Sequence, residues 1–100
     1  MIKVAKTSDI SPNSGKVVQS GSEVLAVFNI DGKFCVVDNS CPHRGGPLGE
    51  GDLNGTVVTC PWHSWQFDVV TGECPDIPGE KIKTYSCKIE GEDIFVEIST

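Results

Sequence analysis

Two short groups of cysteine and histidine constrain this chain more than any other feature of its sequence. The first is Cys41-x-His43, and the second, separated from it by sixteen residues, is Cys60-x-x-His63. Two thiolates and two imidazoles suit a metal centre, and a structural zinc ion is one interpretation. The tight Cys-x-His pair argues against zinc, because structural zinc pairs usually leave at least two residues between ligands that reach one ion. A pair of metal atoms fits this spacing better, since the ligands of each group can then bind different metals.

The residues around both groups resemble the Rieske ferredoxin family. The stretches that carry the resemblance are Cys41-Pro42-His43-Arg44-Gly45-Gly46-Pro47-Leu48 and Cys60-Pro61-Trp62-His63-Ser64-Trp65-Gln66-Phe67-Asp68. Asp31-Gly32-Lys33-Phe34 and Thr71-Gly72-Glu73 match further positions of the family, so the resemblance extends over the whole chain. It implies an all-β Rieske fold, with an antiparallel β-sandwich or barrel base and a small inserted lobe that binds the cluster.

The resemblance also implies the cofactor, its ligands and a function. The cofactor is one 2Fe–2S cluster, with Cys41 and Cys60 on the inner iron and His43 and His63 on the outer iron. The implied function is single-electron transfer from a flavin reductase to a terminal oxygenase. Two alternatives stay open: the small subunit of an NAD(P)H nitrite reductase, bound to its large subunit, and a zinc-stabilised interaction module.

Hydrophobic alternation predicts a chain of short strands in one domain of 100 residues. Asp31-Gly32 between two apolar runs predicts a tight hairpin, and Thr71-Gly72 and Glu90-Gly91-Glu92 predict further reversals. No window has a helical period, although Thr7 to Ile10 could form one short turn. The expected strands lie near residues 2–5, 16–19, 24–30, 33–38, 55–60, 65–70, 82–89 and 93–98.

Two stretches break this strand pattern, residues 40–54 and 71–79. The first holds six glycines and prolines among its fifteen residues. Irregular loops of that length are uncommon in compact domains unless they are functional. We therefore expect a cluster-binding lobe near 38–81, inserted in a β base formed by 1–37 and 82–100.

Several neighbours of the predicted ligands have expected roles. Gly45 and Gly46 allow tight turns of the backbone, and Trp62, between two ligands, should lie close to the cluster. Trp65 and Phe67 should pack the small core of the lobe. The prolines expected to shield the cluster are Pro42, Pro61 and Pro78. The remaining cysteines, Cys35, Cys74 and Cys87, are expected to be structural, although Cys74 could lie near the cluster.

The sequence departs from the high-potential branch of the family. That branch has a disulfide between positions that here are Gly46 and Trp62, so this chain cannot form it. The same branch has hydroxyl donors to the cluster sulfurs where this chain has Trp65 and Phe67. The chain therefore resembles the low-potential, soluble branch.

The net charge of −6 lies entirely in one segment. Residues 34–80 hold seven acids and a single base, Arg44, whereas the rest of the chain is neutral. This argues against nucleic acid as a partner, because phosphate recognition needs a basic face. The longest apolar run, Val24 to Phe28, is far too short for a membrane span. With no signal peptide recognisable at the N-terminus, we expect a cytoplasmic protein, monomeric when free.

Overall fold

The structure is a computed structural model of the chain. It describes residues 2–20, 23–40, 46–62, 65–75, 77 and 79–97. The described part contains strands and two short 3-10 helices. In chain order the elements are β1 (Ile2–Lys6), η1 (Thr7–Asp9), β2 (Ser14–Ser20), β3 (Glu23–Ile30), β4 (Lys33–Asp38), η2 (Leu48–Glu50), β5 (Asp52–Asn54), β6 (Val57–Thr59), β7 (Gln66–Asp68), β8 (Thr84–Tyr85), β9 (Cys87–Glu90) and β10 (Asp93–Val96).

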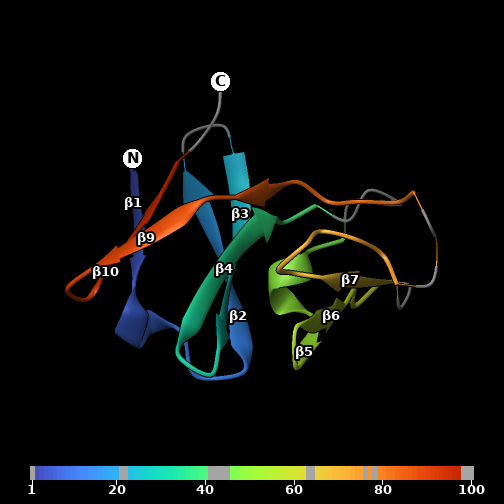
Figure 1. The fold of residues 1–100 in the computed structure, drawn as a ribbon, viewed down its shortest axis with the longest axis horizontal. Helices are drawn as coiled ribbons and strands as arrows, with labels where there is room; N and C mark the ends of the chain where they lie inside the picture. Colours follow the sequence, from blue (N-terminus) through green and yellow to red (C-terminus); the bar gives the residue numbers. More distant parts are fainter. Residues whose placement is uncertain are drawn as a thin grey trace.

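These strands form three antiparallel sheets. Their orders are β1-β10-β9, β2-β3-β4-β8 and β5-β6-β7. In Figure 1 the four-stranded sheet lies in the middle, with the β1-β10-β9 sheet to one side and the β5-β6-β7 sheet to the other. The predicted all-β, antiparallel fold is confirmed.

The central strand β3 explains why the chain contains one continuous apolar run. Its residues 25–29 are all buried, so both of its faces are covered. Leu25 and Val27 belong to a core shared with Ile94 and Val96 of β10. Ala26 and Phe28 belong to a second core, shared with Val58 of β6 and Phe67 of β7. Because successive side chains of a strand point to opposite faces, β3 separates the two cores.

The predicted hairpin at Asp31-Gly32 is confirmed. Ile30 pairs with Lys33, and both turn residues have positive φ, 54° for Asp31 and 92° for Gly32. Both residues of a type I′ turn need such φ values. The buried Asn29 stabilises the turn, because its Oδ1 accepts a 2.7 Å hydrogen bond from the Gly32 N–H. Its Nδ2 donates a 2.8 Å hydrogen bond to the Ile10 carbonyl.

The predicted irregular loop over residues 40–54 is wrong in its second half. Residues 48–50 form η2 and residues 52–54 form β5. β5 pairs with β6 through a two-residue turn, Gly55-Thr56, in which Gly55 has φ 64°. The expected strand 55–60 is therefore shorter, as β6, and the expected strand 82–89 is divided into β8 and β9 at Ser86.

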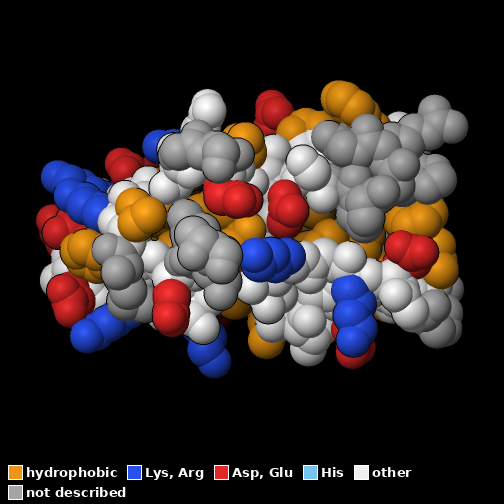
Figure 2. All heavy atoms as spheres, turned by 90° about the horizontal axis from the view of Figure 1, so that it is seen from above, with side chains coloured by type: hydrophobic (Ala, Val, Ile, Leu, Met, Phe, Trp, Pro, Cys, Tyr) orange, Lys and Arg blue, Asp and Glu red, His pale blue; other side chains and the backbone are white. Residues whose placement is uncertain are grey.

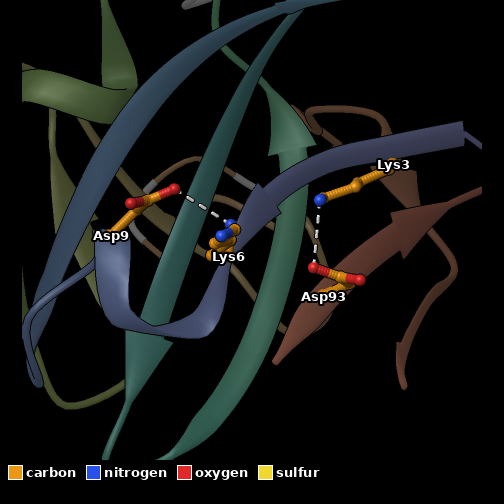
Figure 3. Close-up of polar contacts among 4 residues, drawn as sticks. All are labelled: Lys3, Lys6, Asp9 and Asp93. Atoms are coloured by element: carbon orange, nitrogen blue, oxygen red, sulfur yellow. Dashed lines mark hydrogen bonds and ion pairs between the residues drawn. The ribbon is translucent and has the colours of Figure 1, made fainter. Parts of the chain in front are cut away.

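Polar contacts join the first strand to the last described one. Lys3 Nζ lies 3.1 Å from Asp93 Oδ1, which links β1 to β10 (Figure 3). The Lys6 N–H donates a 3.0 Å hydrogen bond to Asp9 Oδ2 at the start of η1, the short turn expected there.

No helix in the described part of the chain has the length and hydrophobicity to cross a membrane.

Candidate metal centre

Three segments that connect the strands are closed at their bases by backbone hydrogen bonds. The first runs from Ser40 to Pro47, residues that form an isolated antiparallel bridge. Immediately below it, the Leu48 N–H donates to the Asn39 carbonyl at 2.8 Å. Asn39 is buried, and its Oδ1 accepts a 2.8 Å hydrogen bond from the Gly49 N–H. The segment that contains Cys41 and His43 therefore starts and ends at fixed points beside the central sheet.

The second and third segments have the same kind of closure. The Cys60 N–H donates to the Trp65 carbonyl at 2.7 Å, which closes the segment that contains His63. In the third, Glu73 and Lys81 form an isolated bridge, and the Cys74 N–H donates to the Glu80 carbonyl at 3.0 Å. In Figure 1 the β5-β6-β7 sheet, from which the second and third segments start, lies at one end of the molecule.

Of the four predicted ligands, the structure describes Cys60. It lies directly after β6, is 1% exposed, and belongs to the core that includes Phe28 and Phe67. Cys41, His43 and His63 lie outside the described residues, as do Pro42, Gly45 and Pro78.

The close approach of Gly46 to Cys60 shows that the first and second segments meet. A Cβ atom built on Gly46 would lie 2.6 Å from Cys60 Sγ and 3.2 Å from Trp62 Cγ. Gly46 is buried at this contact. A thiol of the second segment thus faces the backbone of the first, three residues after His43. A donor set of two thiols and two imidazoles on adjoining segments fits an iron–sulfur cluster with mixed ligands.

Trp65 and Phe67 pack in the core as the sequence predicts. Phe67 is fully buried, and Trp65 packs against the same core with its ring centroid 6.3 Å from that of Phe67. Trp62 is 64% exposed, although Cys60, two residues earlier, is buried. The second segment therefore passes from core to surface within three residues.

The other three cysteines divide into two groups. Cys74 is 5% exposed and belongs to the same core as Cys60. Cys35 in β4 and Cys87 in β9 are half-buried, and Cys87 Sγ donates to the Phe34 carbonyl at 3.2 Å. Burial raises the pKa of the Cys35 thiol, and the neighbouring Cys87 thiol raises it further. Burial also raises the pKa of Cys87.

Sequence reasoning missed two residues that hold these segments in place. Asn39 stands directly before the first segment, and its contacts with the backbone of η2 could not be foreseen because η2 was not expected. Asp68, at the end of β7, accepts hydrogen bonds from the Val70 N–H at 2.8 Å and the Thr71 N–H at 3.3 Å. An aspartate followed by a Thr-Gly pair is a signal for such a side-chain-stabilised turn.

The charged residues are distributed over both ends of the molecule. Glu50, Asp52 and Glu73 are exposed, as a role in partner contact requires. On the face shown in Figure 2, acidic and basic side chains lie together at the end with β9 and β10, and hydrophobic side chains are visible toward the opposite end.

Comparison with known proteins identifies the family of this chain. The Rieske [2Fe-2S] domain model matches residues 1–86. The biphenyl dioxygenase ferredoxin subunit of Pseudomonas sp. strain KKS102 is 34% identical over 99 residues, which cover 97% of this chain and 91% of that protein. The solved structure of the Sphingomonas yanoikuyae B1 ferredoxin superimposes with a TM-score of 0.89 at 30% identity, with 98% of each chain covered. The ferredoxin chain in a complex of reduced oxygenase and oxidised ferredoxin of carbazole 1,9a-dioxygenase has a TM-score of 0.87 at 28% identity, covering 96% of this chain and 100% of that one.

The chain belongs to the Rieske [2Fe-2S] family. Its cofactor is one 2Fe–2S cluster of the Rieske type, bound by two cysteines and two histidines. Within the family it is similar to the ferredoxin components of dioxygenase systems, which transfer electrons and do not themselves catalyse the oxygenation. The predicted family, cofactor and electron-transfer function are confirmed.

Proposed function

We propose that this protein is a soluble, cytoplasmic ferredoxin that carries single electrons from a flavin reductase to a terminal Rieske oxygenase, and that it is a monomer when free. The observation that supports this most is the similarity over 97% of the chain to a dioxygenase ferredoxin subunit. The likeness to a ferredoxin solved in complex with an oxygenase supports the same partner. The net charge of −6 argues against a nucleic-acid partner.

We further propose that Cys41, His43, Cys60 and His63 bind the cluster. A Rieske cluster takes two histidines, and the chain contains two. Each histidine shares its segment with one cysteine, and Cys60 is buried where the first two segments meet. Residues 38–81 are then the cluster-binding lobe, with the base formed by 1–37 and 82–100. All three strands of the β5-β6-β7 sheet belong to this lobe.

Cys35, Cys74 and Cys87 fit the ligand role less well. Cys35 and Cys87 belong to strands β4 and β9 and not to the segments that contain the histidines, although Cys35 packs against the core that includes Cys60. Cys74 lies in the third segment, which has no histidine. The three therefore supply substitutions that should preserve the cluster.

The bound cluster supplies one-electron chemistry, since it accepts one electron and releases it again. The residues of this chain provide its environment. Cys60 lies in a hydrophobic core that excludes water. The hydrogen bonds at the bases of the segments, from the Leu48 and Cys60 N–H groups, keep the ligand-bearing chain in place. Trp62 is exposed beside the ligands and gives an acceptor protein a large apolar contact.

Metal and sulfide analysis, together with EPR spectroscopy, tests the ligand set. We expect two irons and two acid-labile sulfides per chain, and a Rieske EPR signal after reduction. His43→Ala and His63→Ala should abolish the native cluster. Cys74→Ser, which removes a buried thiol from the same core, should retain it. Stoichiometric zinc without labile sulfide would contradict the assignment.

Anaerobic stopped-flow mixing tests the place in the electron-transfer chain. The reduced protein should be oxidised by a terminal Rieske oxygenase, and the oxidised protein should be reduced by a flavin reductase with NAD(P)H. Sedimentation should give a monomer. Stable co-sedimentation with a nitrite reductase large subunit, with no transfer to an oxygenase, would instead support the nitrite reductase alternative.

A further inference from the structure

Gly46 occupies a position at which the protein leaves no room for a side chain. The added Cβ would approach Cys60 Sγ to 2.6 Å, closer than real Cβ atoms come to any neighbour. On its other side it would meet Trp62 Cγ at 3.2 Å and Trp62 Cδ2 at 3.3 Å. These two atoms are adjacent in the indole, at the side of the ring nearest to the backbone. Gly46 is thus enclosed between the thiol and the indole.

Trp62 combines high exposure with this inward contact. It exposes 64% of its surface, so one side of the indole faces solvent. Its Cγ and Cδ2 atoms face Gly46, and Gly46 is itself buried. Cys60 remains 1% exposed although Pro61, next to it, is exposed. Gly46 thus lies against this thiol, and Trp62 lies against Gly46.

We propose that Trp62 packs on Gly46 as a cover that closes the Cys60 sulfur from water and fixes the first ligand segment against the second. Trp62 is in this view a positioning and shielding residue, in addition to any contact it makes with a partner protein. The inference rests on the proposed binding of the cluster by Cys60. Gly46 is required because its backbone must approach both the sulfur and the ring.

Such a cover has two measurable consequences. Solvent exposure and hydrogen bonds to ligand sulfur tune the potential of an iron–sulfur cluster. Water that reaches Cys60 can donate a hydrogen bond to its sulfur and stabilise the reduced state, which carries one more negative charge. Loss of the cover should therefore raise the midpoint potential. It should also open a path by which a chelator removes iron.

The test compares cluster-loaded Trp62→Ala and Trp62→Phe with the unaltered protein. The measurements are the bleaching rate with an iron chelator, the midpoint potential and the EPR spectrum. Trp62→Ala should lose its cluster about 10-fold faster or more, because loss of a residue that supports metal ligands typically lowers metal affinity by about 10- to 100-fold. Its midpoint potential should rise. Trp62→Phe keeps an aromatic ring over Gly46, so its bleaching rate and its midpoint potential should remain near those of the unaltered protein.

Two glycine variants separate this contact from general packing damage. Gly46→Ala places a methyl group against Cys60 Sγ and should shift the EPR g-values and speed cluster loss. Gly15→Ala is the matched control, because its Cβ would lie 2.5 Å from Phe28 Cε1 and does not meet the thiol. Gly15→Ala should reduce thermal stability and keep the native EPR spectrum. If Gly46→Ala does not fold, the two Trp62 variants decide the question.

The proposal is overturned if Trp62→Ala loses iron at the original rate with an unchanged potential. If Trp62→Ala transfers electrons to the oxygenase more slowly but keeps the original rate of iron loss and the original midpoint potential, Trp62 acts in docking alone. Failure of the unaltered protein to hold iron and labile sulfide would instead refute the proposed function. The two failures are therefore distinguishable.

Discussion

Asp68 offers a sharp test of how the third segment is attached to the rest of the molecule. Its Oδ1 accepts hydrogen bonds from the Val70 N–H at 2.8 Å and the Thr71 N–H at 3.3 Å. Its Oδ2 accepts from the Thr56 hydroxyl at 3.2 Å. The backbone of Asp68 is also paired, because its N–H donates to the Glu73 carbonyl at 2.8 Å. One side chain thus joins the β5–β6 turn, the end of β7 and the start of the third segment.

The cost of Asp68→Ala follows from these distances. A hydrogen bond to a charged acceptor contributes about 1.5–3 kcal/mol, and the short bond from Val70 belongs in this range. The two bonds longer than 3.1 Å contribute less, and the half-buried carboxylate is partly screened by water. We therefore expect a loss of about 2 kcal/mol from a total near 5–15 kcal/mol. For a domain of this size the melting temperature should fall by roughly 8–16 °C.

Thermal unfolding of the cluster-loaded protein, followed by far-UV circular dichroism at one scan rate, measures this loss. Asp68→Asn keeps an Oδ1 acceptor and loses the charge, so its melting temperature should lie between those of the unaltered protein and Asp68→Ala. Asp52→Ala removes an exposed acid from the edge strand β5 and serves as the control, with little change expected. A melting temperature for Asp68→Ala within experimental error of the control would refute the assigned role of this side chain.

Three further outcomes are expected. Redox titration with EPR should give a midpoint potential below roughly +150 mV, within a Rieske range of about −150 to +300 mV. The same titration of Phe67→Tyr should give a higher midpoint potential if the new hydroxyl donates to a cysteine sulfur. Electron-transfer rates to the oxygenase or reductase, measured by stopped flow, should fall as the salt concentration rises, and rates independent of ionic strength would contradict electrostatic steering. Glu73→Gln should weaken this salt dependence, whereas Glu92→Gln, in the distant β9–β10 turn, should leave it unchanged. Cys35 and Cys87, whose pKa values are raised by burial, should react with iodoacetamide more slowly than a free cysteine at neutral pH and faster as the pH rises above the ordinary thiol pKa, as mass spectrometry of the native protein can follow.

The sequence predicted the strands best where hydrophobic pattern and turn chemistry agree. The β3–β4 hairpin is the clearest case, because Asp31-Gly32 supplies the positive φ values that the turn needs. The apolar run of β3 also predicted a strand. It could not show that this strand lies between two cores, since burial of both faces depends on β10 and β6, which come from distant parts of the chain.

The sequence was least informative where glycine and proline are dense. The strand β5, Asp52–Asn54, has three residues and no alternation long enough to recognise. It exists because β6 offers a partner and Gly55 permits the turn between them. The candidate site was predicted from residue type and spacing together with the resemblance to the Rieske ferredoxin family. The role of Asn39 was not, because a buried amide that accepts from the Gly49 N–H depends on how two segments pack.

The arrangement of the second segment connects the fold with electron transfer. Cys60 belongs to the core that β3 supports, and Trp62 lies at the surface. A site at such a boundary can keep one ligand sulfur in a water-free, low-dielectric environment and still bring the cofactor close to a docked protein. Backbone hydrogen bonds of the Cys60 and Leu48 N–H groups close the segments within the chain itself. The boundary between core and surface at Cys60 and Trp62 therefore does not depend on contacts with a partner protein. The position of Cys60 should therefore be set before docking, which lets one carrier serve a reductase and an oxygenase in turn.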